Sequence, residues 1–206
     1  MKKRYISIAL VLVLAIGATV AWVSGPHAEL PTAQEALVDR VLGSEDAPIT
    51  MIEYSSLTCP HCASFHKDTF PLIKKNYIDT GKVRFIMRDF PFDRAALFAS
   101  MMARCVAPDR YYGTLDVLFR SQQNWSRADD PLRALGQVGR MVGLSEADFR
   151  ACLANQELMD GVIESRRTGE KEHEVASTPT FVINGEVVSG ALPYEEFDKI
   201  LKPLAE

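Results

Sequence analysis

Two cysteines with two residues between them, Cys59 and Cys62, are the side chains best suited to chemistry in this 206-residue chain. A C-x-x-C pair can form a reversible disulfide or supply two ligands to zinc. A zinc site needs four ligands, and His66 is a candidate third, but there is no second C-x-x-C and no H-x-x-x-H. A c-type haem requires histidine directly after the second cysteine, where Ala63 stands. The pattern therefore predicts a redox pair with no metal and no cofactor, and leaves an inert structural disulfide as the alternative.

The position of the pair suggests how its chemistry is tuned. An apolar strand pattern at 49–54 precedes it and a helical pattern follows it, so Cys59 should lie at a helix N-terminus among free N–H groups. Pro60 suits the first turn of a helix, and His61 adds a donor near the sulfur. All three features should lower the pKa of Cys59, whereas Cys62, one turn further on, should be more buried and less ionised. A stabilised thiolate favours the reduced form and makes the disulfide oxidising, so we expect His61→Ala or His61→Thr to raise the pKa of Cys59 and to weaken the oxidant.

An acidic residue lies close to this pair. Glu53 precedes Cys59 by six residues and shares a strand face with Ile49 and Met51. A carboxyl group among apolar neighbours should be buried with a raised pKa. A partly solvated glutamate at the strand end is the alternative. The histidines to which we assign no role are His27, His66 and His173.

The remaining patterns predict an α/β fold. Further strands are expected at 82–90, 180–183 and 187–190, with Asn184-Gly185 forming a type I′ turn before the last. The first two strands and the helix between them form a βαβ unit, in which Pro71 should kink the helix. A last helix is expected at 194–201. Between the strands at 82–90 and 180–183 the pattern predicts helices throughout, with candidates at 95–107, 110–121, 130–142, 145–154 and 157–174.

The N-terminus resembles an export segment. Lys2, Lys3 and Arg4 precede an uncharged run at 5–23, so residues 1–25 are expected to be a signal peptide or, slightly favoured, an uncleaved membrane anchor. Residues 26–43 are expected to form a linker with one short helix at 33–42. The positive-inside rule places the rest of the chain outside the cytoplasm. A net charge of −4 and a pI near 5.6 argue against nucleic acid as a partner.

The chain has four cysteines, an even number that suits an oxidising compartment. Three pairings are open, and the short gap between Cys59 and Cys62 favours that pair together with Cys105–Cys152. The second pair would be a structural disulfide that closes a loop of nearly 50 residues, a constraint of roughly 4 kcal/mol in the chain-entropy model. Two buried free thiols are the alternative.

Two motifs resemble a known family. The stretch EYSSLTCPHCASFH and the later segment STPTFVING are similar to the active-site and cis-proline regions of the DsbA family of thiol:disulfide oxidoreductases. The similarity covers roughly residues 44–202. It implies a thioredoxin-like domain formed by 44–92 and 175–206, with an all-helical insertion at 93–174.

The resemblance also implies roles for individual residues. Cys59 corresponds to the nucleophile and Cys62 to the resolving cysteine, while Glu53 corresponds to an acid that handles the proton of Cys62. Pro179 corresponds to the cis-proline, and the backbone of Thr178 should pair with an extended substrate. A trans turn proline is the alternative.

The resemblance further implies a cellular compartment, substrates and a redox partner. The expected protein is a periplasmic monomer that oxidises unfolded exported polypeptides with free thiols, and a DsbB-type, quinone-linked membrane protein reoxidises it. Thr178 stands where the best-known oxidases have valine, so an isomerase or reductase remains an alternative function. Isomerases usually need an added dimerisation domain, for which the short stretch after Val23 leaves no room. A non-catalytic metal-binding or chaperone module is the third hypothesis.

Overall fold

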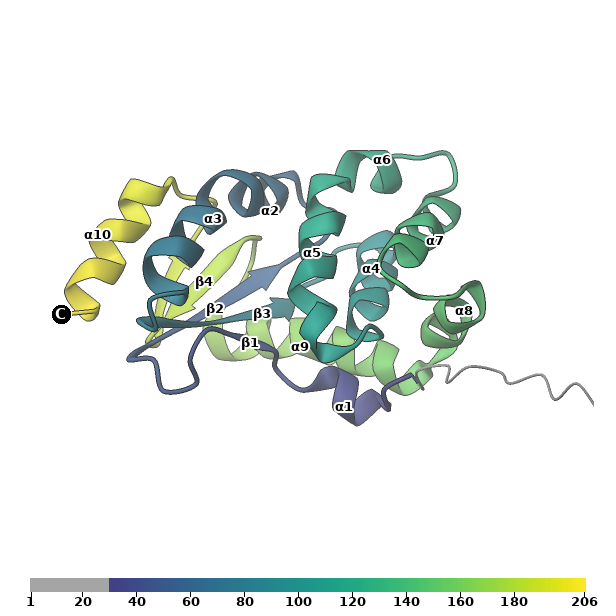
Figure 1. Ribbon diagram of the computed structural model, residues 1–206, viewed down its shortest axis with the longest axis horizontal. Coiled ribbons are helices and arrows are strands. Elements are labelled where there is room, and N and C mark those ends of the chain that lie inside the picture. The colour runs from purple at the N-terminus through teal and green to yellow at the C-terminus, as the bar shows by residue number, and fades with distance from the viewer. Residues whose placement is uncertain (1–29) are drawn as a thin grey trace, which may run out of the picture.

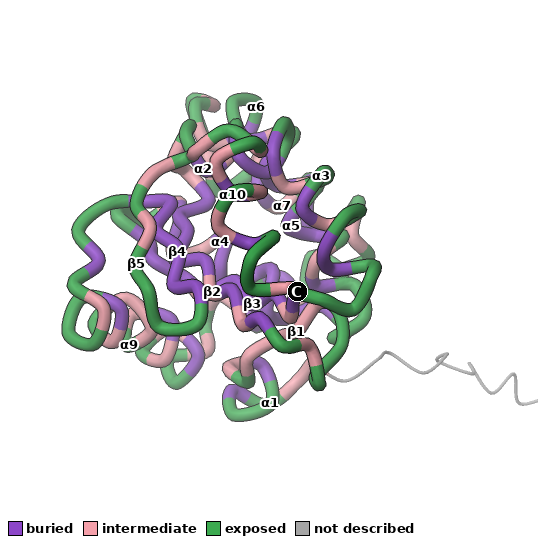
Figure 2. The backbone as a smooth tube through the Cα atoms, turned by 90° about the vertical axis from the view of Figure 1, so that its left-hand side faces the viewer, coloured by how far each residue is buried: buried purple, intermediate pink, exposed green. Residues whose placement is uncertain are grey.

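The computed structural model describes residues 30–206, which fold around a five-stranded mixed sheet in the order β1-β3-β2-β4-β5. The strands are β1 (Val41–Leu42), β2 (Ile49–Ser55), β3 (Val83–Asp89), β4 (Thr180–Ile183) and β5 (Glu186–Ser189). The central pair, β2 and β3, is parallel, and the other neighbours are antiparallel. The inner strands are largely buried and the edge strand β5 is largely exposed (Figure 2). The predicted α/β class is confirmed.

The crossover from β2 to β3 is a long helix of mixed geometry. It consists of α2 (Pro60–Ser64), a π-helical turn (Phe65–Thr69), α3 (Phe70–Ile73) and a second π-helical turn (Lys74–Ile78). The amide of Phe70 bonds the carbonyl of Phe65, five residues back. Pro71 has no amide hydrogen to continue the α-helical ladder, so the helix widens on both sides of it.

Helices fill the chain between β3 and β4. They are α4 (Arg94–Arg104), a 3-10 turn (Pro108–Arg110), α5 (Tyr111–Arg120), α6 (Gln122–Ser126), α7 (Pro131–Met141), α8 (Glu146–Ala154) and α9 (Gln156–His173). The side chains of Asp93, Asp130, Ser145 and Asn155 cap the N-termini of α4, α7, α8 and α9 by accepting amide hydrogens. The short helix α6 was not predicted.

These elements form layers around the sheet. Helices α2 and α3, together with the last helix α10 (Tyr194–Leu204), lie over one face, and α9 runs beneath the other (Figure 1). Helices α4 to α8 gather at one end of the sheet. Helix α9 approaches β2 so closely at Gly169 that an added Cβ would lie 2.7 Å from the Tyr54 ring. Glycine is therefore required there.

The N-terminal part of the described chain differs from the expected helix within 33–42. Helix α1 (Ala33–Leu37) stops after one and a half turns because Val38 turns to extended backbone, and the Arg40 guanidinium satisfies the free carbonyl of Glu35. Val41 and Leu42 then pair with β3 as an edge strand. The expected export segment, residues 1–25, lies outside the described residues. From residue 30 onward, no helix has the length and apolar character to cross a bilayer.

Candidate active site

Cys59 lies where β2 passes into the crossover helix. It has extended backbone angles (φ −75°, ψ 120°) and forms the N-cap of α2, with Pro60 as the first helical residue. Its amide bonds the carbonyl of Ser56 at 3.1 Å, and its carbonyl accepts from the amide of Ala63 at 3.2 Å. The sulfur is half-buried, while Pro60 and His61 are exposed. Cys59 therefore presents its sulfur at the start of a helix, as the sequence predicted.

Hydrogen bonds lower the pKa of Cys59 to about 5 from an ordinary value of 9.0. The thiol of Cys62 donates the bond with the largest effect, the hydroxyl of Thr178 adds to it, and the amides of Cys62 and His61 contribute less. Partial burial opposes these effects. At pH 7 the sulfur is therefore almost entirely a thiolate. The His61 imidazole is not among the groups that lower this pKa, and within residues 30–206 its side chain makes no hydrogen bond.

Cys62 has the opposite environment. Its side chain has no exposed surface, and burial raises its pKa well above the ordinary value. Its hydrogen bond to Cys59 and the nearby negative charge of Glu53 act in the same direction, whereas the hydroxyl of Ser55 opposes them. The pair therefore consists of one accessible thiolate and one buried thiol, both in the reduced form.

The segment before β4 reaches over the redox pair. Sγ of Cys59 lies 3.3 Å from the backbone carbonyl oxygen of Thr178, across 119 residues of sequence, and donates to it only when the sulfur is protonated. The peptide bond between Thr178 and Pro179 is cis. Thr178 is buried, and its hydroxyl acts on the Cys59 sulfur. The structure thus brings together Cys59, Cys62, Thr178 and Pro179, as the resemblance implied.

Glu53 and His66 form a buried pair beside Cys62. Glu53 projects from β2 with no exposed surface, and its Oε2 lies 2.8 Å from Nε2 of His66. The sequence around His66 suggests a surface histidine, to which no role was assigned, but the structure buries it. It follows Cys62 by four residues, so one helix turn carries both side chains to the same buried face. An i, i+4 relation to the redox cysteine was the signal that could have found it.

The helical insertion holds the active-site loop from two sides. Thr58 donates its hydroxyl to Asp93, the N-cap of α4, at 2.6 Å. The buried amide group of Gln122, at the start of α6, donates to the carbonyls of Leu57 and Cys59 at 2.9 Å each. Neither contact was predicted, and that of Gln122 depends on α6, which was not recognised as a helix. The loop that carries Cys59 is therefore part of the interface between the sheet and the insertion.

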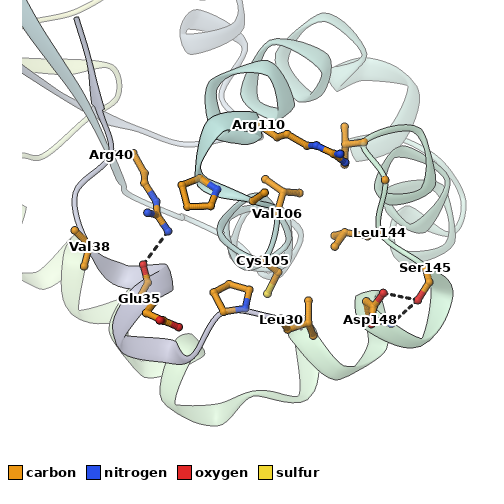
Figure 3. A pocket seen from close by; sticks show the side chains of 15 residues that line it. Leu30, Glu35, Val38, Arg40, Cys105, Val106, Arg110, Leu144, Ser145 and Asp148 are labelled. Atoms are coloured by element: carbon orange, nitrogen blue, oxygen red, sulfur yellow. Dashed lines mark hydrogen bonds between the residues drawn. The ribbon is translucent and has the colours of Figure 1, made fainter. Parts of the chain in front are cut away.

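The other two cysteines lie away from this site. Cys105 and Cys152 form a disulfide between the end of α4 and helix α8. A cavity of about 690 Å³ borders Cys105 and is walled by the start of the described chain, the end of α4 and the α7–α8 turn (Figure 3). Its lining includes neither Cys59 nor Cys62. In the described part of the chain, no cluster of three His, Cys, Asp or Glu side chains is arranged to hold a metal ion.

The sheet, the crossover helix and the paired cysteines define a thioredoxin-fold protein with a dithiol centre. A protein-family model described as Thioredoxin matches residues 35–203. The solved structure of alpha-DsbA1 from Wolbachia pipientis superposes with a TM-score of 0.77 at 31% identity, covering 82% of this chain and 91% of that one. The chain belongs to the DsbA family of the thioredoxin fold.

Curated relatives agree with this assignment. A putative protein-disulfide oxidoreductase of Rickettsia bellii is 32% identical over 148 residues, which are 71% of this chain and 57% of that protein. Disulfide bond formation protein D of Bacillus subtilis is 26% identical over 166 residues, covering 79% and 75%. The chain thus spans little more than half the length of the Rickettsia relative.

Proposed function

We propose that this protein is a dithiol oxidase that introduces disulfide bonds into exported polypeptides through Cys59 and Cys62. The observation that carries the proposal is the contrast between the two sulfurs. The pKa of Cys59 is about 5, while that of Cys62 is raised well above the ordinary value. Because a stable thiolate favours the dithiol form, the disulfide form accepts electrons readily.

The geometry supports a two-step exchange. In the first step a substrate thiolate attacks Sγ of Cys59, the Cys59–Cys62 bond breaks, and Cys62 takes the bonding electron pair and then a proton. In the second step another thiolate of the substrate attacks the substrate sulfur that is bonded to Cys59 in the mixed disulfide. Cys59 leaves as a thiolate, a good leaving group because its pKa is low. The substrate gains a disulfide and the enzyme is reduced.

The Thr178 carbonyl supports the role of this segment in substrate binding. It lies 3.3 Å from Sγ of Cys59. A Cys59 thiolate, or a Cys59 sulfur joined to a substrate, has no hydrogen to donate, so the carbonyl is free to accept an amide of an extended chain. We propose that Thr178 and Pro179 bind substrate backbone in this way, with no dependence on its sequence.

The proposed compartment, substrates and redox partner are inferred from the sequence. The basic N-terminus followed by a long uncharged run supports export, by a cleaved signal or a membrane anchor, into the periplasm. The substrates would be unfolded exported polypeptides, and a DsbB-type quinone-linked membrane protein would return Cys59 and Cys62 to the disulfide. We propose a monomer.

The test is the redox equilibrium of the pair with glutathione, together with its state in the cell envelope. An oxidase should be more oxidising than glutathione and should be found mainly in the disulfide form. A Cys62→Ala variant should accumulate mixed disulfides with substrates through Cys59, and Cys59→Ala should not. A pair that is mainly reduced in the envelope would reject the oxidase.

One observation favours a second candidate, an isomerase or reductase. The residue before the cis-proline is Thr178, and its buried hydroxyl contributes to the low pKa of Cys59. Threonine at this position also occurs in isomerases and reductases of the fold. Refolding of a scrambled, fully disulfide-bonded protein separates the two, because an isomerase restores its activity and an oxidase does not.

A further inference from the structure

A carboxylate and an imidazole lie in contact beside Cys62 with little access to water. Glu53 has no exposed surface, and only 6% of His66 is exposed. One carboxylate oxygen of Glu53 accepts from His66 at 2.8 Å, and the other, Oε1, is buried without a hydrogen-bond partner. An unpaired buried carboxylate oxygen costs free energy and calls for an explanation.

The imidazole is held in one orientation. Its ring stacks on Phe119 of α5, with centroids 4.1 Å apart and planes inclined by 14°. Phe70 and Phe65 pack at 4.9 and 5.3 Å. A histidine fixed in this way keeps Nε2 directed at Glu53, so the contact does not depend on a mobile side chain.

The surroundings leave His66 as the basic partner of the carboxylate. Within residues 30–206, no lysine or arginine nitrogen lies within 4.0 Å of Glu53. Its register partners on β3 and β4 are apolar, Met87 and Phe181. The titratable groups on which the charge of Glu53 acts are Cys62 on the crossover helix and Tyr112 on α5.

Burial also limits the route by which a proton can pass between Glu53 and solvent. Glu53 is enclosed, so a proton that reaches it from solvent must pass through a hydrogen-bonded neighbour. His66 is such a neighbour and keeps a small contact with the surface. A groove of about 370 Å³ between α2 and α5 is lined by Phe119, against which the imidazole stacks.

We propose that His66 is a positioning residue for dithiol exchange, which acts through Glu53 by supplying and removing the proton of Cys62. The proposal rests on the proposed exchange reaction and extends it to a residue outside the C-x-x-C motif. The imidazole gives Glu53 a hydrogen-bond partner in the interior, and it connects the buried carboxyl group with solvent.

The proton balance is as follows. When a substrate thiolate breaks the Cys59–Cys62 bond, Cys62 receives the bonding electron pair and takes a proton from the Glu53–His66 pair, which regains one from water through His66. In reoxidation Cys62 gives its proton to Glu53, attacks Cys59 in a mixed disulfide and expels the partner's sulfur as a thiolate. His66 then releases a proton to water.

The experiment is the reaction of the reduced protein with oxidised glutathione, quenched with acid and resolved by mass spectrometry from pH 5 to pH 9. The first step, in which Cys59 forms the mixed disulfide, should be unchanged in His66→Gln. The second step, in which Cys62 acts, should slow by about tenfold at pH 7, and its pH midpoint should rise by about one unit. Glutamine keeps a donor for Glu53 but cannot carry a proton, so the change isolates proton transfer.

The controls separate this role from a structural one. His173→Gln changes a histidine outside the site and should leave both steps unaltered. The double variant Glu53→Gln/His66→Gln should be no slower in the second step than Glu53→Gln alone, because His66 acts through Glu53. An unshifted second-step profile in His66→Gln would overturn the proposal while leaving dithiol exchange intact. If the wild-type protein shows no exchange at all, both proposals fail.

A measurement on the unmodified protein covers the case in which His66→Gln does not fold. In the unmodified protein the second step, in which Cys62 gives up its proton through Glu53 and His66, should be slower in D2O than in H2O, while the first step, in which the Cys59 thiolate attacks, should not. A second step with no solvent isotope effect would contradict the relay.

Discussion

The side-chain amide of Gln122 donates a hydrogen bond to the backbone carbonyl of Cys59 at 2.9 Å, and so ties the redox centre to the helical insertion. The same nitrogen donates to the carbonyl of Leu57. Because Gln122 is buried, neither carbonyl has water as a substitute. The position of the Cys59 sulfur is therefore fixed in part by a residue 63 positions along the chain.

We predict that Gln122→Ala lowers the free energy of unfolding by about 1–3 kcal/mol, because the carbonyl of Leu57 loses its donor in the interior while that of Cys59 keeps only the amide of Ala63. The loop should also loosen, which would broaden the titration of the Cys59 thiolate. Guanidinium unfolding and thiolate absorbance measure the two effects. Gln123→Ala, at an exposed position next to it, is the matched control and should change neither. Equal stability of the two variants would show that the contacts to the loop are dispensable.

We predict that His61→Ala raises the pKa of Cys59 by less than about one unit. The substitution removes an exposed imidazole, whose charge is screened by solvent, but it keeps the backbone amide that faces the sulfur. The rate of iodoacetamide alkylation against pH reports the change. A rise of about three units would instead make the imidazole the main stabilising group. An unchanged curve would remove it from the mechanism.

We predict that replacing both Cys105 and Cys152 with alanine destabilises the protein by roughly 4 kcal/mol, because the disulfide closes a long loop of the unfolded chain. The equilibrium of Cys59 and Cys62 with glutathione should stay the same, since the two pairs lie in separate parts of the fold. Thermal unfolding and the glutathione equilibrium provide the two readouts. A shifted equilibrium would show that the second disulfide influences the first.

Much of the fold could be predicted from the chain because its signals are local. Strands of β-branched and aromatic residues, the Asn184-Gly185 turn and the capping residues each act over a few positions. Asn184 and Gly185 both have positive φ, as that turn requires. The Cys59-Pro60-His61-Cys62 motif similarly specifies a helix start by itself.

What could not be predicted depends on contacts between distant segments. The role of Gln122 requires α6 to lie against the active-site loop, and nothing in its neighbours indicates this. The charged neighbours Lys67 and Asp68 suggest that His66 lies on the surface, but Phe119 covers it from a helix some 50 positions away. Both cases are tertiary contacts that override a local pattern.

The low pKa of Cys59 has a consequence for stability. A thiol whose pKa falls from 9.0 in the unfolded chain to about 5 in the folded one stabilises the dithiol form above pH 9, and this contribution is lost as pH falls through 5. Between these values the folded protein binds fewer protons than the unfolded chain, so stability rises with pH. The raised pKa of Cys62 acts in the opposite direction, but only above pH 9.

We therefore predict that the dithiol form gains stability relative to the disulfide form as pH rises from 5 to 8. In the disulfide form neither sulfur titrates, so the difference in unfolding free energy between the two forms isolates the pair. Its slope should not exceed about 1.4 kcal/mol per pH unit, the limit for one proton. Guanidinium unfolding of both forms at four pH values tests this, and Cys59→Ala in the reduced state should remove the dependence. If the stabilities of the two forms ran parallel with pH, the thiolate could not be what makes this disulfide an oxidant.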